Sequence, residues 1–294
     1  NWTEAVKLSE EHAGKFDKRL FLPYARWLEG KGRFDDALGA YLKAGRRDLS
    51  RAMMGRIIHN SVIKTRFDDV AYYYWSSSNE ARTAAKVANE AADEEEAQQA
   101  LELANEHSRL ADLYHAFHLV HSFTVDPFTS LQPDVLLQVS RFLINSLGEG
   151  ESPQGISRAH TLYTLAKQAK ILGAFKLARF AYDRLQRQQI PPLWQDQIDF
   201  DMLTVQAKPV RDSPELLVAC FRCGSTNPLL NPFISTSIPT GVGGGGGEDA
   251  RSEETFGIGV RAGGDACTTC RHQFVRSFIN FEALPLVQFE PESG

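Results

Sequence analysis

Residues 162–191 read LYTLAKQAKILGAFKLARFAYDRLQRQQIP and contain nearly all of one tetratricopeptide-like helical hairpin. Its nine signature positions are Leu162, Leu165, Ala166, Ala169, Gly173, Phe175, Ala178, Tyr182 and Leu185. The small residues at 166 and 178 let two antiparallel helices approach closely, and the large residues fill the groove between them. A single hairpin cannot bury its apolar faces alone. This stretch therefore predicts an α-solenoid of stacked hairpins around it.

A second copy of the same pattern lies near the start of the chain. Its nine positions are Phe21, Tyr24, Ala25, Leu28, Gly32, Phe34, Ala37, Tyr41 and Ala44. The distance between the two copies is not a whole number of 34-residue repeats, so the array between them is predicted to be irregular. We expect residues 1–211 to form a mostly α, tetratricopeptide-like helical solenoid.

Other helices are expected around these hairpins. Asp93 and Glu96 resemble a capping box at the start of an acidic helix. Pro133 suits a first helical turn and Gly148 a C-terminal cap, which predicts one helix between them. A last helix, 194–206, follows two prolines and is expected to cap the solenoid.

The composition is that of a globular protein. The chain has 294 residues, of which 43% are hydrophobic and 23% charged, enough for a sizeable core. It has no apolar run of the roughly 18 residues that a membrane span needs, and no signal-peptide pattern at its start. Trp2 and Ala5 resemble the second helix of a hairpin that begins upstream. We therefore expect a soluble part of a longer protein, with no direct membrane span.

The net charge of −5 is concentrated at the C-terminal end, where residues 212–294 contain five arginines and ten acidic residues. Proteins that bind phosphate backbones use clustered lysines and arginines. The acidic end therefore argues against a nucleic-acid partner.

Two clusters each allow a functional and a structural interpretation. The aromatic run 72–75 could stack nucleic-acid bases, but four adjacent residues point to all sides of a helix, which favours core packing and contacts with a flanking hairpin. His115, His118 and His121 could hold a metal. Because the third histidine is rotated well away from the first, solvated or hydrogen-bonded histidines are favoured.

All four cysteines fall in two CxxC pairs, and these predict a metal site: Cys220, Cys223, Cys267 and Cys270. Two CxxC turns facing each other complete a four-thiolate zinc site with no open coordination position, so the zinc should be structural. Disulfides are disfavoured without a secretion signal, and a thioredoxin-like redox pair is disfavoured without a βαβ pattern. His272 could replace one thiolate. No catalytic residue and no other cofactor site is predicted.

The segment between the CxxC pairs is much longer than the roughly 15 to 20 residues usual for this pattern. Residues 235–264 are rich in glycine and serine and acidic, which predicts a flexible insert that a zinc site tolerates. The glycine strings 243–247 and 257–262 lack the sequence context of a nucleotide site. Short apolar runs at 216–221 and 273–281 predict strands. We expect residues 212–294 to form a small β zinc ribbon.

Five strings resemble, in the same order, the C-terminal part of the intraflagellar transport protein 122 family. They are VAYYYW at 70–75, ADLYHAFH at 111–118, SRFLINSL at 140–147, TLAKQAKILGAFKLARFAYDRL at 164–185 and CFRCGSTNPLLN at 220–231. The second CxxC follows them, so the resemblance covers nearly the whole chain. The glycine-rich stretch is a departure, because the family usually has a much shorter link there.

The resemblance implies a WD-repeat and tetratricopeptide subunit of intraflagellar transport complex A, with its WD-repeat propellers upstream. It implies a scaffold in the cilium or flagellum, at the axoneme and basal body on the cytoplasmic side. Its partners would be the other complex A subunits and, through the complex, a tubby-like adaptor and membrane cargo. The implied process is retrograde transport and ciliary entry of membrane receptors.

Two other functional classes stay as alternatives. Zinc ribbons and helical repeats also occur in nucleic-acid-binding proteins, although the acidic C-terminal end argues against that class here. An enzyme would need an open metal position or a lone thiolate, which the sequence does not offer. We therefore expect an interaction scaffold and no enzyme.

Overall fold

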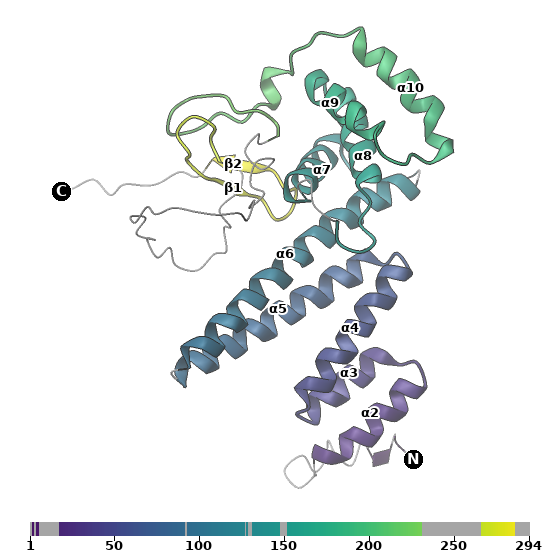
Figure 1. The fold of residues 1–294 in the computed structure, drawn as a ribbon, viewed down its shortest axis with the longest axis vertical. Coiled ribbons are helices and arrows are strands. Elements are labelled where there is room, and N and C mark those ends of the chain that lie inside the picture. Colours follow the sequence, from purple (N-terminus) through teal and green to yellow (C-terminus); the bar gives the residue numbers. More distant parts are fainter. Residues whose placement is uncertain are drawn as a thin grey trace, which may run out of the picture. The chain divides into compact units, whose positions relative to one another are not determined.

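The chain is described from a computed structural model, which describes residues 2, 4–5, 18–91, 93–126, 128, 131–147, 152–230 and 266–285. Its helices are α2 (Phe21–Gly30), α3 (Phe34–Lys43), α4 (Arg47–Ile63), α5 (Phe67–Glu90), α6 (Glu94–Val125), α7 (Pro133–Leu147), α8 (Arg158–Ile171), α9 (Phe175–Leu185) and α10 (Pro192–Gln206). Two 3₁₀ turns, η1 (Lys18–Leu20) and η2 (Pro214–Leu216), and two strands, β1 (Phe274–Arg276) and β2 (Ala283–Pro285), complete the described elements. The predicted mostly α fold with a small C-terminal sheet is confirmed (Figure 1).

These residues divide into two compact units, Asn1–Ala111 and Asp112–Gly294, and the boundary falls within α6. The division into a solenoid at 1–211 and a ribbon at 212–294 stays a prediction. Among the described helices, none is both long enough and apolar enough to cross a lipid bilayer.

The first unit contains the N-terminal hairpin, formed by α2 and α3. Ala25, Leu28 and Ala37 are fully buried where the two helices meet, as the repeat signature predicts. The Tyr41 hydroxyl donates a 3.0 Å hydrogen bond to Glu29, which ties α3 to α2. The following helices α4, α5 and α6 are longer than those of the hairpin, so the predicted irregularity of the array is confirmed.

The start of α6 follows the predicted capping pattern. The carboxylate of Asp93 accepts a 3.0 Å hydrogen bond from the backbone N–H of Glu96, which satisfies one of the free donors of the first turn. Within the first unit, the buried Ser78 hydroxyl of α5 donates to the Ala104 carbonyl of α6 over 2.8 Å. This bond joins the two helices at a buried position.

The aromatic run on α5 divides between two environments. The Tyr73 hydroxyl donates to Asp35, and the Tyr74 ring lies 5.6 Å from that of His107. Tyr72 and Trp75 are exposed. The core-packing interpretation is therefore wrong for Tyr72 and Trp75, because residues three positions apart lie on the same side of a helix and this side is exposed.

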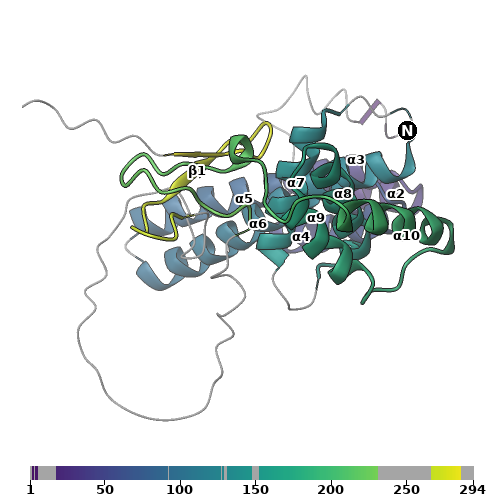
Figure 2. The ribbon, with the colours of Figure 1, turned by 90° about the horizontal axis from the view of Figure 1, so that it is seen from above.

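The second unit contains the hairpin quoted first, formed by α8 and α9, with α7 packed against α8 (Figure 2). Ala166 and Ala178 are fully buried at the contact of α8 with α9. Gly173, between the helices, has a φ of +80°, which glycine adopts without steric cost. The hydroxyl of Ser157 caps α8 by accepting from the N–H of His160. Both ends of α8 are thus encoded locally, and the predicted hairpin is confirmed.

Replacing Ala178 with leucine is expected to destabilise the protein by about 1 to 3 kcal/mol, because the added atoms have no space between α8 and α9. The measurement is the urea unfolding midpoint followed by the helical circular dichroism signal. Asp183→Leu is the matched control, since Asp183 is an exposed position on the same helix. Equal midpoints for the two variants would contradict the close helix contact.

The segment that leaves α10 is fixed on α9 at both ends. The guanidinium of Arg179 donates to the carbonyls of Val205 at 2.8 Å and Pro209 at 2.9 Å, near the C-terminal end of α10. The carboxylate of Asp212 accepts from the backbone N–H groups of Lys176 at 2.8 Å and Leu177 at 3.2 Å, and so caps the start of α9. The C-terminal ribbon, residues 214–230 and 266–285, therefore begins from an anchored position.

Candidate metal centre

Each CxxC pair forms a tight turn closed by backbone hydrogen bonds. In the first turn, the N–H of Gly224 donates to the Cys220 carbonyl over 2.8 Å, and the N–H of Cys220 donates to the Ser225 carbonyl over 2.9 Å. Ala219 and Thr226 form an antiparallel bridge just outside the turn. Gly224 has a φ of +68°, which explains a glycine directly after the second cysteine.

The second turn repeats this geometry at equivalent positions. The N–H of Arg271 donates to the Cys267 carbonyl over 3.0 Å, and the N–H of Cys267 donates to the His272 carbonyl over 2.8 Å. A bridge joins Ala266 to Gln273. Arg271 takes the place of the glycine, with a φ of +59°. Two segments far apart in the sequence thus form the same knuckle.

The knuckles bring the four thiols together. All four Sγ atoms lie within 4.8 Å of one another, with 3.5 Å between Cys220 and Cys270 and 3.6 Å between Cys223 and Cys267. A tetrahedron of thiolates around zinc, with Zn–S bonds of about 2.3 Å, has edges of about 3.8 Å. The cluster therefore has the size that a tetrathiolate metal site requires. All four cysteines are free thiols.

The surroundings of the thiols favour anionic sulfur at some positions and oppose it at others. A backbone hydrogen bond from Cys270, followed by the Ser225 hydroxyl, lowers the pKa of Cys267 to about 5. The pKa of Cys270 is lowered by the His272 N–H, but burial and the neighbouring thiols outweigh that effect and raise it to about 12. Four thiolates this close repel one another, and a divalent cation would remove that repulsion. The donor set therefore fits a metal ion.

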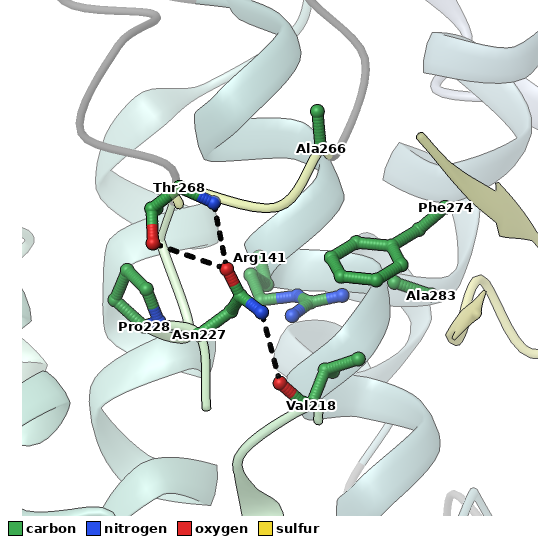
Figure 3. A pocket seen from close by; sticks show the side chains of 8 residues that line it. All are labelled: Arg141, Val218, Asn227, Pro228, Ala266, Thr268, Phe274 and Ala283. Atoms are coloured by element: carbon green, nitrogen blue, oxygen red, sulfur yellow. Dashed lines mark hydrogen bonds between the residues drawn. The ribbon is translucent and has the colours of Figure 1, made fainter. Parts of the chain in front are cut away.

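Asn227 joins the two knuckles (Figure 3). Its Oδ1 accepts hydrogen bonds from the backbone N–H and the hydroxyl of Thr268, at 2.8 and 3.2 Å. Its amide group donates to the carbonyls of Val218 at 3.2 Å and Ser225 at 3.1 Å. The side chain is almost fully buried. A single amide thus fixes the second knuckle against the first.

Replacing Asn227 with alanine is expected to weaken metal binding by about 10- to 100-fold, as the loss of groups that orient metal ligands typically does. All four thiols remain, but nothing holds Thr268 against the first knuckle. The measurement is competition with a chromogenic chelator. Gln273→Ala, an exposed change in the same ribbon, is the control. Unchanged affinity in Asn227→Ala would show that the thiols are positioned by other contacts.

The ribbon packs on α6 and α7 within the second unit. Arg276 of β1 forms a 3.0 Å ion pair with Asp112 of α6, and its guanidinium lies 3.7 Å from the ring centre of Phe142 on α7. The ring of Phe281 lies 5.0 Å from that of Phe142 and 5.9 Å from that of His115. Arg276, paired with Asp112 and lying over the ring of Phe142, therefore attaches the ribbon to the helices.

A small cavity lies under this contact, between the ribbon and the buried Arg141 of α7 (Figure 3). Its volume is about 20 Å³, which is room for about one water molecule. It is lined by Arg141, Val218, Asn227, Pro228, Ala266, Thr268, Phe274 and Ala283. A cavity of this size belongs to a packing interface and has no room for a substrate.

Two sequence-based expectations about the ribbon need correction. In the run 216–221, only Ala219 forms a β-bridge, and Leu216 ends the 3₁₀ turn η2. In the run 273–281, the strand is limited to β1, which pairs with β2 in the register Val275 to Leu284. The first run enters the first CxxC turn, and residues 277–282 form the turn that joins β1 to β2, closed by a 2.7 Å hydrogen bond from the N–H of Ser277 to the Glu282 carbonyl.

Other candidate sites have separate outcomes. Among the described residues, the group of side chains close enough together to hold a metal ion consists of the four cysteines. His272 and the histidines at 115, 118 and 121 do not belong to it. Burial lowers the pKa of His115, which packs on Phe281. The insert 235–264 with its glycine strings, and Gly148, lie outside the described residues.

The chain is similar to one family of proteins along its whole length. A family model described as "IFT122, TPR domain" matches residues 1–160. Curated relatives named intraflagellar transport protein 122 homolog are 36% identical in zebrafish (Danio rerio) over 294 residues and 37% identical in mouse (Mus musculus) over 293 residues. The human (Homo sapiens) relative is also 37% identical over 293 residues.

These matches cover 100% of this chain but only 22% of the zebrafish and mouse relatives and 20% of the human one. The chain thus spans about a fifth of the length of the curated relatives it matches. The family match covers α2 to α7 and ends at the start of α8, and the similarity to the relatives extends over the rest of the chain, including both CxxC knuckles. The chain belongs to the intraflagellar transport protein 122 family, with the tetratricopeptide-type helices of that family followed by a four-cysteine ribbon.

Proposed function

We propose that Cys220, Cys223, Cys267 and Cys270 hold one structural zinc ion. The support is the cluster of four thiols, whose separations match the edges of a zinc tetrathiolate. When bound, zinc supplies a closed coordination shell that joins the two knuckles and leaves no position for a substrate. Two side chains of this chain position the knuckles, since Asn227 sets their spacing and Arg276 attaches them to the helices.

We further propose that the protein is a non-enzymatic scaffold subunit of intraflagellar transport complex A. The observation that carries this proposal is the similarity to intraflagellar transport protein 122 homologues along the whole chain. Stacked helical hairpins provide extended surfaces for partner proteins, as solenoids generally do. The proposed site of action is the cilium, on its cytoplasmic side at the axoneme and basal body. The proposed process is retrograde transport and receptor entry, with a tubby-like adaptor and membrane cargo reached through the complex.

The test is co-purification of other proteins with the epitope-tagged protein from ciliated cells. We expect the other complex A subunits to co-purify, and zinc to be present at one ion per chain by elemental analysis. A tetrathiolate site also accepts iron, and iron would colour the protein whereas zinc does not. Absence of complex A subunits would contradict the scaffold role, and stoichiometric iron would contradict the zinc assignment.

A further inference from the structure

Helix α10 has two apolar faces, and only one of them is covered. The inner face, with Ile198 and Val205, is buried against α9. On the opposite face, Leu193, Phe200 and Leu203 are 94%, 65% and 67% exposed. Residues three and seven positions apart lie on one side of a helix, so the three side chains form a stripe. We call the exposed surface on this side of the helix the α10 outer face.

As expected, α10 is the last helix of the described array, but its outer face is not the polar surface of a capping helix. Terminal repeats of a solenoid need a polar outer surface. Large apolar side chains on a helix that ends an array are instead typical of a surface that another element covers. The described residues contain no such element.

The position of α10 shows what kind of element would fit. Trp194 of α10 stacks on Tyr163 of α8, with ring centres 4.4 Å apart, and Lys170 of α8 forms a 2.6 Å ion pair with Asp201 of α10. In an array of hairpins, a helix that contacts both helices of the preceding hairpin is the first helix of the next hairpin. The second helix of that hairpin would pack on the outer face. Among the described residues, the chain instead returns to α9 through Arg179 and Asp212.

The charge around the outer face points to the chemistry of the occupant. Asp196 lies within the apolar stripe and Asp199 at its edge, and both are exposed. The helix itself, PLWQDQIDFDMLTVQ, contains no lysine or arginine. Lys170 lies 5.7 Å from the ring centre of Phe200, but its charge is paired with Asp201. The outer face is therefore apolar and acidic.

We propose that the α10 outer face binds an amphipathic helix of another subunit of the transport complex, with an apolar stripe flanked by lysines or arginines. This inference rests on the proposed scaffold function and adds the surface and the chemistry of the partner. A second copy of the chain is disfavoured, because a two-fold contact through this face would bring Asp196 near its own counterpart. An anionic membrane surface would be repelled by the same carboxylates.

The first test is photo-crosslinking in the assembled complex. The photoreactive residue p-benzoylphenylalanine replaces Phe200 in the full-length protein in ciliated cells, and the crosslinked peptide is identified by mass spectrometry. We expect one segment of another complex A subunit, with apolar residues at helical spacing and flanking basic residues. The same probe at Gln195, exposed on α10 but off the stripe, is the control and should give at least about tenfold less of this product.

The second test exchanges the charges. Asp196→Lys combined with Asp199→Lys should reduce the crosslink from position 200 at least about tenfold, as expected when like charges face each other in an interface. Changing the basic residues of the crosslinked segment to glutamate should restore it. Leu203→Glu should abolish the crosslink, and the glutamate substitutions in the partner segment should not restore it. All these positions are exposed, so the helical circular dichroism of each variant should equal that of the wild type.

The outcomes separate this inference from the scaffold function. If complex A subunits co-purify but the crosslink from position 200 leads to this same protein, to a segment without flanking basic residues, or to nothing, the inference is wrong and the scaffold function stands. Failure of the charge exchange to restore the crosslink also contradicts it. If no complex A subunit co-purifies with the wild type, the scaffold function fails, and this inference with it.

Discussion

Replacing Cys267 with serine is expected to abolish stoichiometric metal binding and to unfold the ribbon while the helices stay folded. The ribbon has only two three-residue strands and a few buried apolar side chains in its described part, so it cannot form a sufficient core of its own. Metal binding is worth about 10 to 16 kcal/mol in small zinc-binding peptides and is folding energy for them. The helices are stabilised by their own packing and should not depend on the metal.

The measurements are metal content, helical circular dichroism and limited proteolysis around residues 266–285. Thr269→Ser is the matched control, because Thr269 is an exposed residue of the same knuckle and not a candidate ligand. Every cysteine of the chain belongs to the cluster, so a retained metal could not be held by other thiols. Stoichiometric zinc in the double variant Cys267→Ser and Cys270→Ser would show that the metal is bound elsewhere.

The parts of the fold that could be predicted from the sequence are those encoded by short spacings. Ala166, Gly173 and Ala178 lie within one hairpin, and each has the burial or backbone conformation that the repeat signature assigns to it. The CxxC spacing likewise encodes each knuckle locally. The sequence could also predict that the two knuckles face each other, because the chain has no other cysteines.

The contacts that position the candidate site could not be predicted in this way. Asn227 contacts Thr268 across 41 residues, and Arg276 pairs with Asp112 across 164 residues. A contact between such distant residues leaves no periodic pattern in a single sequence. The only local signal for the first contact is a polar residue, Asn227, that follows Gly-Ser-Thr and precedes a proline just after a CxxC. A polar residue there also suits a turn, which is why that signal was not sufficient.

Which side of α10 is covered could not be predicted from the sequence either. Apolar residues occur on both sides of this helix, and that pattern is typical of a helix buried all round. Periodicity alone could not show that Ile198 is buried while Phe200 is exposed. The structure distinguishes them because it shows which side of α10 meets α9. The distinction matters for function, since the exposed side is the one available to a partner.

The inner face of α10 also carries a buried carboxylate, Asp201, that joins three helices. Asp201 is 3% exposed and accepts hydrogen bonds from the Lys170 ammonium of α8 at 2.6 Å, the Tyr182 hydroxyl of α9 at 3.1 Å and the Gln197 amide at 3.0 Å. Burial, and next the charge of Asp201, raise the pKa of Tyr182. The phenol therefore stays protonated at neutral pH and remains a donor to the carboxylate.

Replacing Asp201 with alanine is expected to destabilise the second unit by about 3 to 5 kcal/mol, because it leaves a half-buried ammonium and a buried hydroxyl without their acceptor. Urea unfolding followed by Trp194 fluorescence measures this in a background in which Trp2, Trp27 and Trp75 are replaced with phenylalanine, since Trp194 lies on the same helix. Asp199→Ala is the matched control, because Asp199 is an exposed carboxylate two positions away and should change stability by less than about 0.5 kcal/mol. The combined change Lys170→Met and Asp201→Leu removes both charges and should recover the part of the loss that comes from the unpaired ammonium, since apolar pairs often replace buried ion pairs without cost. The part that comes from the Tyr182 hydroxyl should remain, because that donor still lacks its acceptor. If Asp201→Ala and Asp199→Ala unfold at the same urea concentration, the carboxylate does not hold α8, α9 and α10 together.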